Sequence, residues 1–236
     1  MNYPPSHDNN EEPSVTTRST FDRQLREIEE DMLVIAGMVE RAIERSITSL
    51  RNRDVELARQ VIVEDMEINR RRYDTEEKCI DLLAMQQPLA RDLRTIVAIL
   101  YIITDLERMG DHAEGIAKVS IMLADDAPLK PYIDIPRMAE KAIAMLRKAI
   151  EAFKHRNVEL ARFTCDDDDE VDALYDQVYR ELLIYMLNDP KTIERATHVT
   201  WIAHNLERIA DRVTNICERV VYMVDGTIEE LNVSKY

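Results

Sequence analysis

Two short motifs place acidic side chains where they could act together. The sequence LERMGD spans residues 106–111, and LERIAD spans residues 206–211. Each motif puts a glutamate four residues before an aspartate, and positions i and i+4 lie on one face of an α-helix. Because like charges at this spacing repel, the motif predicts a cation or basic side chains beside it. The two pairs are Glu107 with Asp111 and Glu207 with Asp211.

Each half of the chain carries a second group of oxygen ligands at the same spacing. In the second half it is Asp168 with Asp172, inside CDDDDEVD, and in the first half it is Asp65 with Asn69, inside EDMEIN. If their helices pack against the LERxxD helices, the two groups of each half face each other. Such oxygen donors suit Mg²⁺, Mn²⁺ or iron. The lack of a nearby imidazole or thiolate disfavours a structural zinc site.

Salt bridges are an alternative explanation of the same residues. Arg108 directly follows the first motif's glutamate and Arg208 the second's, so arginines could satisfy these carboxylates without a metal. Motif geometry alone leaves both interpretations open. An aspartate run such as 166–169 is by itself typical of a solvated surface, and its repetition in register with LERxxD favours a site. His112 directly follows the first motif, but the equivalent position after the second motif is Arg212, which cannot bind a metal ion. The repeat therefore does not support His112 as a ligand.

Helical periodicity and an internal repeat determine the expected fold. Apolar residues recur every three or four positions, and RDVELARQ in the first half is echoed by RNVELARF in the second. Asp54 is the expected N-cap of the helix that follows the first joint. We therefore predict an all-α protein of two sequence-repeated three-helix bundles related by a pseudo-two-fold axis. The expected divisions are a disordered tail over 1–20, a first bundle over 21–124, a proline-rich linker over 125–136, a second bundle over 137–226 and a C-terminal tail over 227–236.

Composition narrows the functional classes. The 236 residues carry a net charge of −15, which argues against a nucleic-acid backbone as partner and against direct electrostatic binding to anionic lipid. Three widely spaced cysteines and no secretory leader predict reduced thiols and a cytoplasmic location. Neither Glu-x-x-His, HExxH, GxGxxG, a P-loop nor GxSxG occurs, so no enzyme is expected.

Taken together, the motifs resemble the PhoU family of phosphate-specific transport system accessory proteins. The resemblance covers about residues 21–226 and rests on order and duplication as well as on single motifs. The motifs are GMVERAI, the DVELAR joint with EDMEIN, QQPLARDLR, LERMGDHAEGIAK and LERIADRVTNICE.

The resemblance implies a fold, a site and a role. The fold is two three-helix bundles, and the acidic motifs are implied to bind multinuclear clusters of iron, manganese, magnesium or zinc. Carried over, these motifs fall on Glu107, Asp111, Glu207 and Asp211, with Asp65, Asn69, Asp168 and Asp172 opposite. Asn69 departs from a full carboxylate pair, so the first cluster is expected to be weaker or smaller.

The implied role is that of a regulatory adaptor. It couples the phosphate ABC transporter to a sensor histidine kinase, restrains uptake and keeps the phosphate-starvation response off. A homodimer is implied, with membrane association only through partners. The alternative from another class is a metal-dependent phosphatase or other hydrolase that uses the clustered carboxylates.

Overall fold

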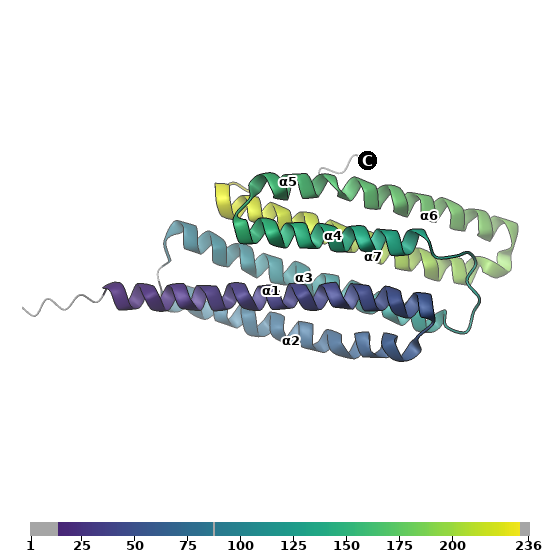
Figure 1. The fold of residues 1–236 in the computed structure, drawn as a ribbon, viewed down its shortest axis with the longest axis horizontal. Coiled ribbons are helices and arrows are strands. Elements are labelled where there is room, and N and C mark those ends of the chain that lie inside the picture. Colours follow the sequence, from purple (N-terminus) through teal and green to yellow (C-terminus); the bar gives the residue numbers. More distant parts are fainter. Residues whose placement is uncertain (1–13, 87, 232–236) are drawn as a thin grey trace, which may run out of the picture.

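The computed structural model describes residues 14–86 and 88–231, and within them the chain forms helices and loops without a β-strand (Figure 1). The prediction of an all-α protein is confirmed. The helices are α1 (Ser14–Asn52), α2 (Val55–Met85), α3 (Ala90–Met122), α4 (Asp134–His155), α5 (Val158–Asp166), α6 (Asp168–Asn188) and α7 (Ile193–Asp225), with a short 3₁₀ helix, η1 (Pro190–Thr192), before α7.

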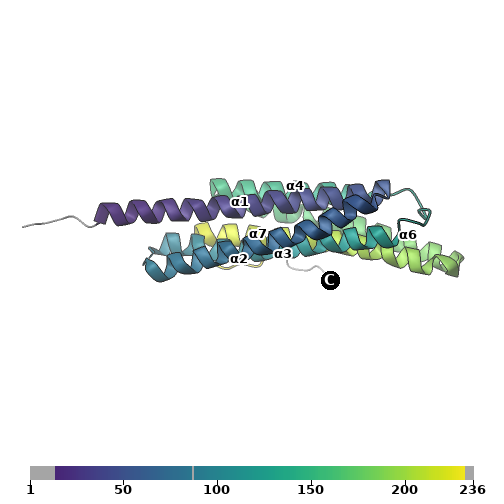
Figure 2. The same ribbon diagram turned by 90° about the horizontal axis from the view of Figure 1, so that it is seen from below.

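The helices form an elongated slab of two layers. Helices α1, α2 and α3 make the first bundle, and α4, α5–α6 and α7 make the second (Figure 1). Seen from the side, α1 and α4 lie in one layer and α2, α3, α6 and α7 in the other (Figure 2). The α2–α3 and α6–α7 connections lie at opposite ends of the body (Figure 1). This arrangement agrees with the predicted pseudo-two-fold relation.

The joint between the first two helices is built in the same way in both repeats. Asp54 caps α2 by accepting a hydrogen bond from the Leu57 amide at 2.9 Å, and Asn157 caps α5 through the Leu160 amide at 3.0 Å. The residue before each cap has a positive φ, 53° at Arg53 and 50° at Arg156, which ends the preceding helix. The predicted N-cap at Asp54 is confirmed.

One apolar core runs through both repeats. Its buried residues come from every long helix; α7 supplies the most, and α1, α3 and α4 supply similar shares. Helix α3 is apolar on several sides over residues 96–103, because α1, α2 and α7 all pack on this helix. Within the described residues, no helix has the continuous hydrophobic length that a membrane span requires.

Two of the expected boundaries lie elsewhere in the structure. Helix α1 begins at Ser14, so residues 14–20 belong to a helix and not to a tail; residues 1–13 lie outside the described range. An ion pair at 2.8 Å between Arg18 and Asp92 of α3 ties down this first stretch of α1. The linker ends before Asp134, and Pro136 lies in the first turn of α4, where a missing amide hydrogen is tolerated.

The middle helix of the second repeat is interrupted. Helices α5 and α6 meet at Asp167. The Asp167 amide donates a hydrogen bond to the Thr164 carbonyl, and the Glu170 amide donates one to the Asp167 carbonyl, so the backbone there makes tight three-residue turns. Lys148 of α4 reaches the Asp167 carboxylate at 2.7 Å. The acidic residues that follow begin α6, where a helix N-terminus favours negative charge.

Candidate functional site

The two central helices, α3 and α7, position the LERxxD motifs, and polar pairs fix their contact. His112 Nδ1 lies 2.8 Å from Asn205 Oδ1. Arg212 donates to Asp105 Oδ1 at 3.3 Å, and Asn215 donates to the same oxygen at 3.1 Å. His112 corresponds to Arg212 in the repeat, and Asp105 to Asn205. The two pairs are therefore related by the pseudo-two-fold axis, and the helices run antiparallel.

In each LERxxD motif the arginine contacts both acidic residues of the same motif, an arrangement that we call an arginine clamp. Arg108 Nε lies 3.4 Å from Glu107 Oε2, and its Nη1 lies 3.2 Å from Asp111 Oδ2. In the second motif Arg208 makes the same contacts, at 3.4 Å to the glutamate and 2.9 Å to the aspartate. The basic partner that the repulsion predicted is thus present within the motif. Both arginine side chains are about half exposed, at 57% and 48%.

The first repeat brings Asp65 of α2 against the motif on α3. Burial, together with the charges of Asp111, Glu114 and Glu107, raises the pKa of Asp65 to about 6. Asn69 donates an amide hydrogen to Asp65 Oδ2 at 2.8 Å. The departure at Asn69 therefore replaces a repelling carboxylate with a hydrogen-bond donor.

Close approach of α2 and α3 depends on the glycine in LERMGD. A Cβ atom built on Gly110 would lie 3.0 Å from Asp65 Oδ1 and 3.3 Å from Ile68 Cδ1. Asp65 Oδ1 is buried there and accepts no hydrogen bond from the described part of the chain. The small residue therefore lets a buried carboxylate reach the acidic motif.

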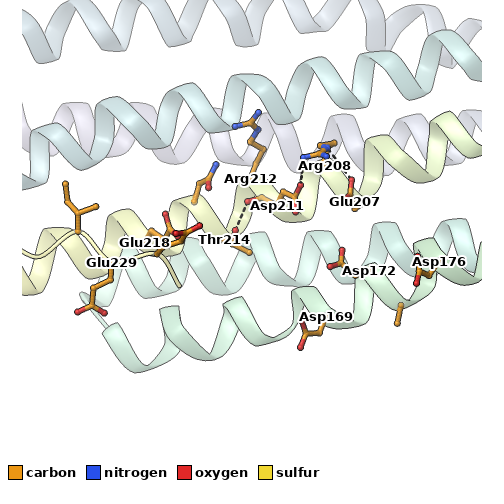
Figure 3. A pocket seen from close by; sticks show the side chains of 14 residues that line it. Asp169, Asp172, Asp176, Glu207, Arg208, Asp211, Arg212, Thr214, Glu218 and Glu229 are labelled. Atoms are coloured by element: carbon orange, nitrogen blue, oxygen red, sulfur yellow. Dashed lines mark hydrogen bonds and ion pairs between the residues drawn. The ribbon is translucent and has the colours of Figure 1, made fainter. Parts of the chain in front are cut away.

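The second repeat forms an open acidic cavity of about 980 Å³ between α6 and α7 (Figure 3). In the figure, the Glu207, Arg208 and Asp211 side chains come from α7, and Asp172 comes from α6. Further acidic residues line the cavity, together with Arg212, Thr214 and Asn215. These are Asp169 and Asp176 of α6, Glu218 of α7, and Glu229 and Glu230 of the C-terminal segment.

Carboxylates of this cavity hold their protons more tightly than usual. Burial and the charges of Asp211 and Asp172 raise the pKa of Glu207 to about 7, although Arg208 acts in the opposite direction. Burial, and then the charge of Asp211, also raises the pKa of Asp172. Asp168 is the first residue of α6. Its side chain is buried, as is that of Asp65 at the equivalent position of the first repeat, and it does not line the cavity.

Several site residues were missed from the sequence. Asp169 and Asp176 continue the acidic face of α6 around Asp172 and could have been found by helical spacing. Glu229 is brought to the cavity by an ion pair at 2.7 Å with Arg162, a long-range contact that leaves no local signal. His204 Nδ1 lies 3.3 Å from Glu207 Oε2, so an imidazole does lie beside the second motif.

The donor chemistry fits a hard divalent cation, but the observed side-chain positions are those of an ion-pair network. The second repeat offers several carboxylates with raised pKa values around a cavity, and the Glu207 Oε2 atom is buried without a hydrogen bond from the described residues. In the part of the chain that the structure covers, no three Asp, Glu, His or Cys side chains are arranged to hold one ion. Coordination would therefore require Arg208 to turn away from its two partners.

The fold and site together define a class: a two-repeat helical protein with one arginine-clamped carboxylate cluster per repeat. The family of the PhoU domain matches residues 32–120 and 135–220, one match in each repeat. This chain belongs to the PhoU family.

Named relatives match almost the whole length. A phosphate-specific transport system accessory protein PhoU homolog from Aquifex aeolicus is 41% identical over 206 residues, 87% of this chain and 93% of the relative. The crystal structure of PhoU from Pseudomonas aeruginosa aligns with a TM-score of 0.84 at 34% identity, covering 88% of this chain and all of that one. The phosphate transport system regulatory protein PhoU from Streptococcus pneumoniae gives 0.82 at 32% identity, covering 89% and 99%.

Proposed function

We propose that this protein is a regulatory adaptor of phosphate homeostasis, which couples a phosphate ABC transporter to a sensor histidine kinase. It restrains phosphate uptake and keeps the starvation response off when phosphate is plentiful. The observation that carries the proposal is the full-length similarity, in both repeats, to relatives named as accessory or regulatory proteins of phosphate transport. Those names also favour an adaptor over the hydrolase alternative.

The acidic clusters supply the surface chemistry of the proposed adaptor. In the second repeat, Glu207 and Asp211 from α7 and Asp172 from α6 would hold a divalent metal, which supplies positive charge among repelling carboxylates. Arg208 would then be free to face a partner. In the first repeat, Asn69 already relieves part of the repulsion on Asp65, so we propose weaker binding there.

Location and assembly belong to the same proposal. We propose that the protein acts in the cytoplasm as a homodimer and reaches the membrane only through its partners. Sedimentation velocity over a range of protein concentrations tests the dimer. A single monomeric species at all concentrations contradicts it.

Metal binding is tested on the purified full-length protein after chelator treatment. We expect titration calorimetry with Mn²⁺ to show saturable binding that Asp172→Asn combined with Asp211→Asn weakens at least tenfold. Glu77→Gln, which changes an exposed residue of α2, should leave the binding isotherm unchanged. Equal Mn²⁺ affinity in all three proteins would reject the site.

Regulation is tested in a strain that lacks this protein and carries a phosphate-starvation reporter. The deletion should raise reporter expression in high phosphate, and the Glu77→Gln variant should restore repression. If expression in the deletion strain stays low, the regulatory proposal fails whether or not the purified protein binds metal. Co-purification with the transporter and the kinase then tests the two partners separately.

A further inference from the structure

Two of the three cysteines lie close together between α5 and α7. Cys165 lies in the last turn of α5 and is 6% exposed, and Cys217 lies on α7 and is fully buried. The neighbouring Cys165 thiol, together with burial, raises the pKa of Cys217 well above its usual range. Cys165 Sγ also lies 4.0 Å from the Thr214 carbonyl oxygen, one turn before Cys217. The Cys165 side chain therefore points from α5 to the turn of α7 that carries Cys217.

The first repeat shows that this packing does not require sulfur. The position equivalent to Cys165 is Ile62, and the position equivalent to Cys217 is Ala117. Ala117 belongs to a small buried apolar cluster between α2 and α3, and the partly buried Ile62 packs against that cluster. An apolar pair fills the same space there, so the thiol pair adds a chemical property that packing alone does not explain.

The thiol pair lies beside the acidic cavity. Cys165 is two residues before Asp167, where α5 ends and the chain turns into α6. Thr214 lines the cavity and donates a hydrogen bond at 2.7 Å to the carbonyl of Asp211. A covalent link between the sulfur atoms would fix the end of α5 to the part of α7 that carries the second motif.

We propose that Cys165 and Cys217 form a redox-sensitive dithiol that closes to an intramolecular disulfide under peroxide. The thiolate of Cys165 attacks one oxygen of hydrogen peroxide, the O–O bond breaks, and water leaves with the thiol proton. The sulfur of Cys217 then attacks the resulting sulfenic acid, the S–S bond forms, and a second water carries away the hydroxyl group and the second proton. Two thiols lose two electrons, and one peroxide becomes two waters.

Burial sets the expected rate of this reaction. Because both thiols are buried, peroxide reaches them only when α5 opens locally, so oxidation should be slow. We expect the rate to rise in low, non-denaturing urea, which favours local opening. The disulfide would then persist, because both sulfur atoms are shielded from reducing thiols.

The experiment uses the reduced full-length protein, treated with hydrogen peroxide and mapped by non-reducing peptide mass spectrometry. We expect loss of two hydrogen atoms, a cross-linked peptide pair containing Cys165 and Cys217, and an unmodified Cys79. Hydrogen exchange of the α5 amides should slow in the oxidised protein and recover with dithiothreitol. Slower exchange distinguishes a covalent clamp from a merely structural thiol pair.

Two variants serve as controls. Cys165→Ile combined with Cys217→Ala installs the residues of the first repeat, and α5 exchange should then not respond to peroxide. Cys217→Ala alone keeps the attacking thiol but should give no cross-link, which covers the case in which the double variant folds poorly. Failure of the wild-type protein to form the Cys165–Cys217 link, or a link that involves Cys79, overturns the proposal.

Discussion

Replacing Glu207 with glutamine should stabilise the metal-free protein at pH 8 and leave its stability nearly unchanged at pH 5. Glu207 is held on α7 between Arg208 and His204, and two further carboxylates of the cavity lie near it. Burial and the charges of those carboxylates raise its pKa to about 7, even with the opposing effect of Arg208. Glutamine keeps the shape of the side chain and removes the charge that the folded state disfavours.

The size and sign of the effect follow from proton linkage. The ordinary pKa of this carboxyl is 4.5, and the folded protein raises it to about 7. Between those values the folded state keeps a proton that the unfolded chain has released, so the free energy of unfolding falls as pH rises. At about 1.4 kcal/mol per pH unit, the loss is about 3 kcal/mol. Solvent screening in the open cavity reduces our expectation to about 1–2 kcal/mol.

The assay is urea unfolding followed by circular dichroism, with a chelator present, at pH 5 and pH 8. The difference between variant and wild type should grow by about 1–2 kcal/mol from the lower to the higher pH. Glu77→Gln on the exposed surface of α2 is the matched control and should show no such growth. If Glu207→Gln destabilises the protein equally at both pH values, its ion pairs outweigh burial and repulsion, and the reasoning is refuted.

Two further predictions concern packing and the contact between repeats. Gly110→Ala should destabilise by about 1 kcal/mol despite the better helix propensity of alanine, because its Cβ would lie 3.0 Å from Asp65 Oδ1. A Cβ atom at Gly37 on α1 would lie no nearer than 3.6 Å to any atom beyond the backbone of its own helix, so Gly37→Ala should stabilise the protein by about 0.5–1 kcal/mol. Equal urea midpoints for the two variants would contradict this account. Asp105→Ala removes the acceptor of Arg212 at 3.3 Å and should cost about 1–3 kcal/mol in the same assay, whereas an unchanged midpoint would show that the contact between repeats does not depend on this pair.

Local signals predicted the fold well because they repeat. Helical periodicity and the echoed joint located the helices, and the cap at Asp54 is matched by Asn157 at the equivalent position. The start of α1 was missed because its first turns are polar; tertiary contacts such as that of Arg18 with Asp92 extend the helix there. The interruption at Asp167 was also missed, since an aspartate run is compatible both with a continuous helix and with a new start.

The site was predictable only where its residues share a helix. The LERxxD pairs and their opposite acids followed from spacing and from the assumption that the middle and last helices of each repeat pack together. Nothing local indicated that Glu229 would return to the cavity, because Arg162 lies far away in sequence. The pairing of Asp105 with Arg212 was equally invisible, because it depends on the antiparallel contact between repeats.

The arginine inside each motif changes the meaning of the repelling carboxylates. Arg208 contacts both acids of its motif, so repulsion alone does not require a metal. Yet the pKa of Glu207 stays raised to about 7, so one half-exposed guanidinium does not offset burial and neighbouring charge. The carboxylates are fixed on a central helix, while the arginine can turn into solvent without disturbing the core. The cluster therefore retains a demand for positive charge, which a proton, a divalent cation or a partner's basic side chain can each meet.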